Sequence, residues 1–465
     1  METLSGQRRL SSRVREVVSS LAICLALAVA AMAVGKVAAA SPPETNLVAS
    51  ATQLVELLAA GNFSNAVSRF DATMRAALPE PKLREAWQAV LKQAGPFQKQ
   101  VRTRVLKQAG YDIVLVSCQF ERAALDTRVV LDAKGQVAGL FFAPGQDESS
   151  VSASPPYART NTFREEDFTV GSGEWRLPGT LTRPLGMTNL LPALVLVHGS
   201  GPNDRDETVG VCKPFRDLAW GLASRGIAVL RYEKRTKVHA AKFTGDILSN
   251  LTVKEETIDD ALAAASQLRV TAGIDPKRIF VLGHSLGGLV APRIGQADPK
   301  LAGLIIMAGA TRPLEDLMVE QTRYLLSVNG TVSTNDQPKL DAMLTEVAKV
   351  KQLSASDTAS STLLLGAPPR YWLDLRAHDP VAIAQTLKQP VLILQGGRDY
   401  QVSDTDFEGW KKGLDSRPNI TFKRYPQLNH LFVAGDGRSA PAEYERPGFV
   451  AEGVVTDDAD WIQGH

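Results

Sequence analysis

The chain contains 465 residues with a formal net charge of +2, 44% hydrophobic residues and three cysteines. The length allows two or three domains, and the composition is typical of soluble globular protein. The near-neutral charge gives no electrostatic reason to expect nucleic-acid binding, and three cysteines are too few for a disulfide-rich scaffold.

The first forty residues have the pattern of a secretory signal peptide. An arginine-rich start is followed by an apolar run over residues 21–34 and by three alanines that end at Ala40. The run is shorter than the roughly 20 apolar residues of a membrane span. We therefore expect cleavage after Ala40 and a secreted or periplasmic protein without a membrane segment; the alternative is an uncleaved N-terminal anchor. Cleavage removes five basic and two acidic residues, so the formal charge changes from +2 to −1.

Residues 42–144 are expected to form a small α+β domain. Apolar residues recur at helical spacing over residues 47–78 and 83–91, and from Phe97 the period shifts towards two. The clearest predicted strands are residues 111–120, 125–133 and 136–144, with a hairpin turn at residues 132–135. No nucleophile, base and acid cluster here, which favours a docking or shielding module, and a polar linker over residues 145–156 follows.

Residues 157–465 alternate between strand-like and helix-like segments. The predicted strands are residues 192–199, 227–232, 278–285, 301–309, 390–397 and 419–425, and the predicted helices among them are residues 215–226 and 257–268. Strands that alternate with helices predict an α/β fold with a doubly wound, mostly parallel sheet. Residues of about 311–388 break this rhythm with helical, polar-rich sequence, which predicts an inserted helical cap.

The stretch "VLGHSLGG", residues 281–288, suggests a catalytic nucleophile. Ser285 is the centre of a G-x-S-x-G pattern, with a predicted strand before it and helix-forming residues after it. A strand, a sharp turn and a helix are the context of a nucleophile elbow, in which small residues must flank a strained serine. Ser285 is therefore the candidate nucleophile, and the helix behind it directs its positive end towards a developing oxyanion.

A serine hydroxyl requires a base, and the base an acid that orients it. Among the six histidines, His430 follows the last predicted strand, where the base of such a fold belongs; His378 lies in or beside the cap. Asp399 follows the strand before it and is the candidate acid. Asp404, interpreted as a helix N-cap partner of Ser403, and Asp406, within that helix, are its rivals. The order Ser285, Asp399, His430 is that of the α/β-hydrolase triad.

Two backbone N–H groups must bind the oxyanion. Leu286, directly after the nucleophile, is one candidate donor. The other is Ser200, with Gly201 as its rival, in the loop "HGSGPNDRDE". The three acidic residues of this loop, Asp204, Asp206 and Glu207, are expected to shape the loop or to face solvent.

Four motifs together resemble a bacterial group of α/β-hydrolases known as carboxylesterase-like or serine-aminopeptidase-like. They are "VHGSGPNDRDE", "GHSLGG", "RYWLDLRAHDP" and "PVLILQGGRDYQV", and the resemblance covers residues 168–433. The first domain resembles the NTF2-like domain of unknown function that precedes some of these hydrolases. The resemblance implies the roles of Ser285, Asp399 and His430 given above. "LRYEKR" is also similar to a family segment that holds an arginine beside the pocket, but here it lacks the glycine that usually follows, so Arg231 receives no role.

A secreted serine hydrolase that cleaves small to medium acyl esters is the function this pattern favours. The alternatives are an aminopeptidase or amidase with the same triad and, third, a non-catalytic binding protein on the same fold. Tyr371 and Trp372 in "GAPPRYWLDL" could wall the substrate pocket or only pack the cap. No cofactor is expected, no histidine or cysteine spacing supports a metal site, and the oligomeric state stays open.

Overall fold

A computed structural model describes residues 44–465 except 109–110, 133, 145–153, 329 and 361. The chain divides into two compact units, one that ends at Ser152 and one that begins at Ala153. Each has its own hydrophobic core. The predicted signal peptide and most of the predicted linker lie outside the described residues.

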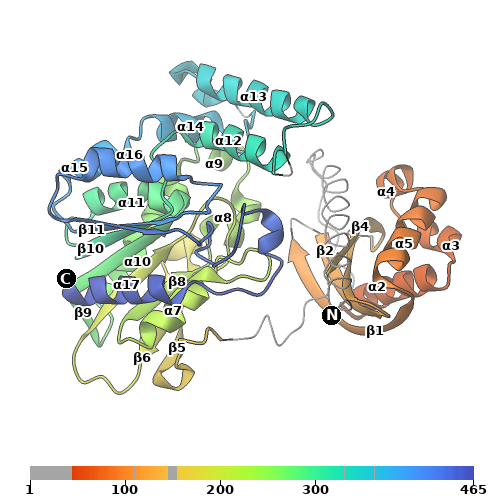
Figure 1. Cartoon of the computed structure of the whole chain (residues 1–465), viewed down its shortest axis with the longest axis horizontal. Helices are drawn as coiled ribbons and strands as arrows, with labels where there is room; N and C mark the ends of the chain where they lie inside the picture. The colour runs from red at the N-terminus through yellow and green to blue at the C-terminus, as the bar shows by residue number, and fades with distance from the viewer. Residues whose placement is uncertain (1–43, 109–110, 133, 145–153, 329, 361) are drawn as a thin grey trace, which may run out of the picture. The chain divides into compact units, whose positions relative to one another are not determined.

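The N-terminal unit packs helices against one face of an antiparallel sheet (Figure 1). Leu54, Leu58 and Trp87 of the helices meet Val114 and Phe120 of the sheet, and all five are buried. The strands pair in the order β1-β2-β3-β4, and the predicted hairpin turn joins the last two. The elements are α2 (Glu44–Ala59), α3 (Phe63–Ser68), α4 (Ala72–Ala77), α5 (Glu80–Ala94), β1 (Phe97–Gln108), β2 (Tyr111–Phe120), β3 (Ala124–Leu131) and β4 (Val137–Pro144).

An eight-stranded sheet in the order β12-β11-β10-β9-β7-β8-β6-β5 forms the centre of the C-terminal unit. Strands β7 to β12 run parallel to their neighbours in that series, whereas β6 pairs antiparallel with both β8 and β5. The strands are β5 (Phe163–Val170), β6 (Leu177–Pro184), β7 (Leu191–Val197), β8 (Ala228–Tyr232), β9 (Ile274–His284), β10 (Gly303–Met307), β11 (Val391–Gly396) and β12 (Ile420–Tyr425). The predicted mostly parallel α/β sheet is confirmed.

Helices cover both faces of this sheet, which is why its central strands are apolar without alternation. In β7, Leu194 and Leu196 contact the core formed with α7 and α17, while Val195 and Val197 contact the core formed with α10 and α11. Every residue of β7 is buried. The main covering helices are α7 (Pro214–Ala223), α10 (Asp259–Arg269), α11 (Leu286–Ala297), α16 (Asp404–Leu414) and α17 (Glu452–Gly464).

A helical segment is inserted between β10 and β11, where the sequence predicts a cap. Its helices are α12 (Leu314–Leu326), α13 (Gln337–Gln352), α14 (Pro369–Arg376) and α15 (Pro380–Thr386). Helix α15 contacts α11 and α16 and belongs to the layer that covers the sheet. We keep the name cap for α12 to α14, whose residues overlie the carboxyl ends of the strands (Figure 1).

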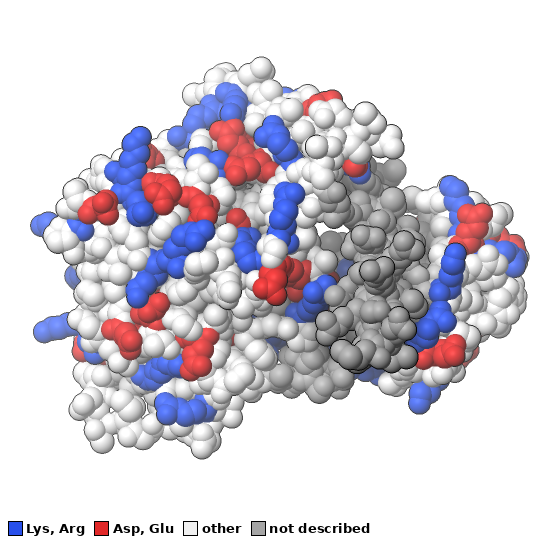
Figure 2. Space-filling model, viewed as in Figure 1, with Lys and Arg blue, Asp and Glu red and all other residues white. Residues whose placement is uncertain are grey.

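Basic and acidic side chains are interspersed over the face of the C-terminal unit that Figure 2 shows. Ion pairs of this unit include Arg424 with Asp404 and Arg312 with Glu320. A surface of this kind favours solubility over electrostatic capture of a charged polymer.

Asp458 in α17 gives a prediction about stability and pH. Its side chain is fully buried, and neither carboxylate oxygen has a hydrogen-bond partner among the described residues. Burial first, and the charge of Asp457 second, raise the pKa of Asp458 well above its ordinary 3.8. As pH rises above that ordinary value, the unfolded chain ionises while the folded protein keeps its proton, so the free energy of unfolding falls. We expect Asp458→Asn to raise Tm by several degrees at pH 8 and by less at pH 5, measured by calorimetry.

Asp457→Asn is the matched control, because Asp457 accepts hydrogen bonds from Tyr425 and Lys423. That substitution should lower Tm at both pH values. An equal gain from Asp458→Asn at pH 5 and pH 8 would show that the raised pKa is not the cause.

Candidate active site

Ser285 occupies a sharp turn between β9 and α11. Its backbone has φ 55° and ψ −115°, a conformation that residues other than glycine rarely adopt. A Cβ at Gly283 would lie 2.1 Å from the Gly287 carbonyl oxygen, and one at Gly287 would lie 2.2 Å from the Val197 carbonyl oxygen. Only glycine fits at either position, which explains the G-x-S-x-G pattern. The turn places the serine at the carboxyl end of the central strand, facing a cavity.

Four other non-glycine residues also have positive φ, among the described residues, and two of them, Glu207 and Leu365, line this cavity. The four are Glu207, Ala308, Leu365 and Phe432. Ala308 directly follows β10, and Phe432 is two residues after His430. Such conformations persist only where the surrounding structure enforces them.

Asp399 and His430 come together in the loops after β11 and β12. The Asp399 Oδ2 atom lies 2.7 Å from His430 Nδ1, and its Oδ1 atom accepts N–H groups from Gln401 at 2.7 Å and Val402 at 3.0 Å. Both side chains are buried. Because a carboxylate can only accept, His430 Nδ1 carries the proton and Nε2 remains an acceptor. His430 and Ser285 line the same cavity.

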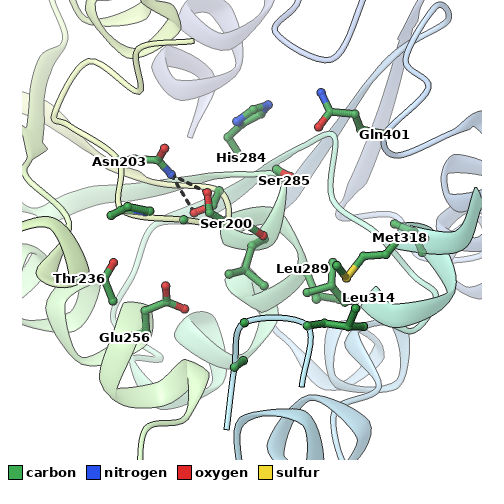
Figure 3. A pocket seen from close by; sticks show the side chains of 18 of the residues that line it. Ser200, Asn203, Thr236, Glu256, His284, Ser285, Leu289, Leu314, Met318 and Gln401 are labelled. Atoms are coloured by element: carbon green, nitrogen blue, oxygen red, sulfur yellow. Dashed lines mark hydrogen bonds between the residues drawn. The ribbon is translucent and has the colours of Figure 1, made fainter. Parts of the chain in front are cut away.

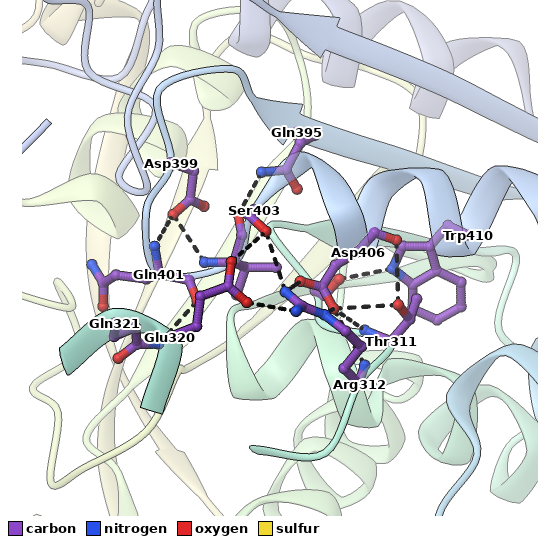
Figure 4. A network of polar contacts seen from close by, with 12 residues as sticks. Thr311, Arg312, Glu320, Gln321, Gln395, Asp399, Gln401, Ser403, Asp406 and Trp410 are labelled. Carbon is purple, nitrogen blue, oxygen red and sulfur yellow. Dashed lines mark hydrogen bonds and ion pairs between the residues drawn. The ribbon is translucent and has the colours of Figure 1, made fainter. Parts of the chain in front are cut away.

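The rival acids are engaged elsewhere. Asp404 binds Arg424 in a two-pronged ion pair at the start of α16, and the Ser403 hydroxyl donates to Glu320 and makes no N-cap bond. Asp406 is fully buried and accepts from Thr311 and Arg312, which ties α16 to the start of the cap (Figure 4). Ser403 is the N-cap residue of α16 and Asp404 is its first residue, as expected, but the Ser403 side chain makes no cap hydrogen bond.

His378 lies apart from Asp399 and His430 and makes a different contact. Its Nε2 atom lies 2.8 Å from the Leu289 carbonyl oxygen of α11. Burial lowers the pKa of His378, so the ring is neutral and donates that hydrogen bond. The arrangement is that of a structural histidine that links the end of α14 to α11, the helix that begins directly after Ser285.

The loop after β7 approaches Ser285 closely. A Cβ added at Gly199 would lie 3.0 Å from Ser285 Cβ and 3.5 Å from Ser285 Oγ. Ser200 and Gly201, the two candidate donors in this loop, both line the cavity, as does Leu286 at the start of α11 (Figure 3). The Gly199 N–H is already occupied, because it donates to Glu207 Oε1 at 2.6 Å.

Glu207 is buried, so of the two expectations for it, facing solvent is wrong, whereas shaping the loop is correct, because it accepts the Gly199 N–H. Its Oε2 atom lies 2.8 Å from His284 Nδ1, and His284 Nε2 lies 3.0 Å from the His430 carbonyl oxygen. Burial lowers the pKa of His284, but the charge of Glu207, its hydrogen bond and the His430 carbonyl outweigh burial and raise it. The pKa of Glu207 falls for the corresponding reason, although burial opposes the fall. The contact between Glu207 and His284 thus joins the loop after β7, the turn at Ser285 and the loop that holds His430.

The other two acids of this loop serve its conformation. Asp204 Oδ1 accepts from the N–H groups of Asp206 and Thr208. Asp206 forms ion pairs with Lys213 and with the buried Arg231, whose second partner is Glu165. Arg231 thus braces β5 against the loop after β7.

The cavity has a volume of about 810 Å³ and a mostly apolar wall. Tyr371 and Trp372 both contribute to it, and both also fasten the cap. Tyr371 donates to Glu256 Oε2 at 2.6 Å, and Trp372 donates to the Leu364 carbonyl at 2.8 Å. Both aromatic residues therefore line the cavity and also pack the cap, and their contact with substrate stays a prediction. The apolar lining includes Phe243, Leu248, Leu251, Leu289, Leu314, Leu317, Met318 and Leu431 (Figure 3).

Two kinds of feature are absent from the described residues. No group of three or more histidine, cysteine, aspartate or glutamate side chains is placed to hold a metal ion. None of the helices in this part of the chain combines the length and hydropathy that a bilayer span requires. Cys118 and Cys212 are free and buried, and burial raises the pKa of each thiol to about 11.

The mostly parallel sheet, the serine elbow and the buried histidine–carboxylate pair define an α/β-hydrolase of the serine type. Residues 193–436 match the family described as serine aminopeptidase, S33, and residues 51–140 match a family of unknown function, DUF3887. The chain belongs to the S33 serine aminopeptidase family of serine hydrolases, with a DUF3887 domain before it.

Relatives within the group include esterases. Esterase EstD of Thermotoga maritima is 38% identical over 408 residues, which cover 88% of this chain and 93% of that protein. Phospholipase YtpA of Bacillus subtilis is 28% identical over 174 residues, 35% of this chain and 65% of that protein. The solved structure of ester-hydrolase EH1AB1 from the metagenome of Lake Arreo has 18% identity and a TM-score of 0.43, over 68% of this chain and 87% of that one. The predicted resemblance to this hydrolase group is confirmed.

Proposed function

We propose that this serine hydrolase is a carboxylesterase for small to medium acyl esters, with Ser285 as nucleophile, His430 as base and Asp399 as acid. The observation that carries the proposal is the state of the acidic residues at the cavity. Of the described residues that line it, two are acidic, Glu207 and Glu256. Glu207 is paired with His284, and Glu256 binds both Lys234 and Tyr371.

An aminopeptidase must bind the protonated amine of its substrate. A buried ammonium without a partner is strongly unfavourable, so such a site needs a carboxylate with free capacity. Both carboxylates here are already neutralised, and the rest of the wall is mostly apolar. An acyl chain without charge fits these surroundings best, and the similarity to Esterase EstD agrees with this choice.

The proposed chemistry follows the geometry of the triad. His430 Nε2 takes the proton of Ser285 Oγ as that oxygen attacks the ester carbonyl, while Asp399 stabilises the imidazolium. The N–H groups of Leu286 and Ser200 bind the oxyanion, and the positive end of α11 adds to their effect. The protonated His430 then donates to the leaving alcohol. Water attacks the acyl-enzyme with His430 again as base, which regenerates Ser285.

A matched pair of substrates tests the choice between esterase and aminopeptidase. Leucine p-nitroanilide and 4-methylpentanoyl p-nitroanilide differ only in the α-amine. We expect kcat/KM to be at least about tenfold higher for the 4-methylpentanoyl anilide than for the leucine anilide. The reason is that the cavity has no free carboxylate to bind the ammonium group of leucine. A series of p-nitrophenyl esters from acetate to palmitate should show its highest kcat/KM at an intermediate chain length. A clear preference for the amine-bearing anilide would overturn the esterase proposal in favour of the aminopeptidase.

We also propose that the protein is exported and that the mature chain begins near Ser41. The support is the arginine-rich start, the apolar run over residues 21–34 and the alanines that end at Ala40. Mass spectrometry of the protein from its native host is expected to give an N-terminus near Ser41 in the extracellular or periplasmic fraction. An N-terminus at Met1 in the cytoplasmic fraction would contradict export.

A further inference from the structure

The segment "RYEKR", residues 231–235, contains a lysine that the proposed chemistry does not use. Lys234 is buried, with a side chain that is 2% exposed. Its Nζ atom lies 2.7 Å from the Gly199 carbonyl oxygen and 3.0 Å from Glu256 Oε1. A buried ammonium group makes strong hydrogen bonds. One of the groups that Lys234 binds is the backbone carbonyl of Gly199, in the loop beside Ser285.

The Gly199 carbonyl is held by two donors. Asn203 Nδ2 lies 3.1 Å from the same oxygen and 3.0 Å from the Ser200 carbonyl oxygen (Figure 3). The Asn203 carbonyl in turn accepts the Lys234 N–H at 3.1 Å. On its other side, Gly199 donates its N–H to Glu207. The conformation of this residue is therefore determined from both ends.

Because the Gly199 C=O and the Ser200 N–H belong to the same peptide unit, fixing the carbonyl also fixes the direction of this candidate oxyanion donor. The peptide between Gly199 and Ser200 is planar and trans, so its C=O and N–H point in opposite directions. A carbonyl fixed towards Lys234 thus fixes the Ser200 N–H on the side away from it. A cation on the carbonyl oxygen also polarises the peptide and strengthens that N–H as a donor.

We propose that Lys234, held in place by Glu256, is a positioning residue for the oxyanion hole that acts through the Gly199–Ser200 peptide. The proposal rests on the esterase function and on Ser200 as donor. Through the bond between Glu256 and Tyr371, the same chain of contacts reaches α14 of the cap. The cap and the oxyanion loop thus share one buried charge pair.

Two variants separate positioning from simple stability. Lys234→Met keeps the length of the side chain and removes both interactions, but it leaves the buried Glu256 with its charge unpaired, which is destabilising. The double variant Lys234→Met with Glu256→Gln removes that charge as well. We expect the single variant to lose Tm and the double variant to recover most of that loss, because neutral glutamine can still bind Tyr371.

In the double variant, we expect Tm to recover but kcat to stay low. In the folded double variant, kcat on the best p-nitrophenyl ester should fall by about 10- to 100-fold, part of the 10²–10³ that loss of a whole oxyanion donor costs, while KM changes by less than about threefold. The affinity for a trifluoromethyl ketone with the same acyl chain should fall by a similar factor, because its hemiketal with Ser285 places an oxyanion in the same position. The affinity for the corresponding alcohol should not change.

Lys237→Met is the matched control. Lys237 lies three residues away, is half exposed and pairs with Glu233, so this variant should keep the wild-type kcat. If the folded double variant keeps kcat within threefold of wild type, or if KM rises and the affinity for the trifluoromethyl ketone does not fall, the proposal is wrong. Ester hydrolysis by the wild type and its loss in Ser285→Ala are measured beside these variants, so failure of the esterase proposal itself is recognised separately.

Discussion

Replacing Ser285 by alanine is expected to abolish ester hydrolysis. The residue occupies the strained turn at the carboxyl end of β9, lines the cavity and lies beside Gly199 of the oxyanion loop. Without the hydroxyl no acyl-enzyme can form, and loss of a triad nucleophile typically lowers kcat by about 10⁶-fold. The measurement is kcat on a p-nitrophenyl ester, with active-site titration of the wild type to fix the enzyme concentration.

The fold should survive this substitution. Alanine can occupy the turn that serine occupies, because both have one Cβ and the positive φ strains them alike. Circular dichroism and Tm should match the wild type within a few degrees. Ser249→Ala, which removes a hydroxyl that bonds only to carbonyls of its own helix, serves as control and should keep full activity. Activity of Ser285→Ala within tenfold of wild type, in a preparation free of other esterases, would refute the assignment of the nucleophile.

The second large effect concerns the base and its acid. His430→Ala should be nearly as damaging as Ser285→Ala, because the same ring takes and returns the proton in both half-reactions. Asp399→Asn should cost less, about 10⁴-fold in kcat, because an asparagine NH₂ facing Nδ1 favours the tautomer whose Nε2 carries the proton. The measurement is kcat for each variant, with Tm to verify folding.

His378→Ala is the matched control for the base. His378 donates to a backbone carbonyl of α11, so its loss should lower Tm more than it lowers kcat. An inactive His378→Ala together with an active His430→Ala would mean that the base has been misassigned.

The parts of the site that could be predicted are those with a local signal or a fixed place in the order of strands. Ser285 has a motif that sterically requires glycine at two positions. Asp399 and His430 follow consecutive late strands, so the topology alone brings their loops together. The helical cap could be predicted because it interrupts the alternation of strands and helices.

The parts that could not be predicted depend on pairs that meet only in three dimensions. Glu207 is one of three acids in a polar loop, and nothing in the sequence says that it alone is buried and bonded to His284. Lys234 and Glu256 are 22 positions apart in segments without a periodic pattern. Strands β5 and β6 were not predicted either. The edge strand "FREEDFTV" buries few of its side chains, and the glycine and two prolines of "LPGTLTRP" are typical of a turn.

The positive backbone angles at Ser285, Glu207 and Leu365, which all line the cavity, have a consequence for protein engineering. A left-handed conformation costs a residue with a side chain about 1–2 kcal/mol, and the whole folding free energy of a domain is only about 5–15 kcal/mol. Three such residues around one site therefore consume a sizeable share of the stability margin. A selection for thermal stability alone would favour glycine or a relaxed loop at these positions and would thereby loosen the geometry of catalysis. A search for a more stable enzyme should therefore keep these three residues and mutate sites away from them. Asp458, whose carboxylate has no hydrogen-bond partner among the described residues, is one such site.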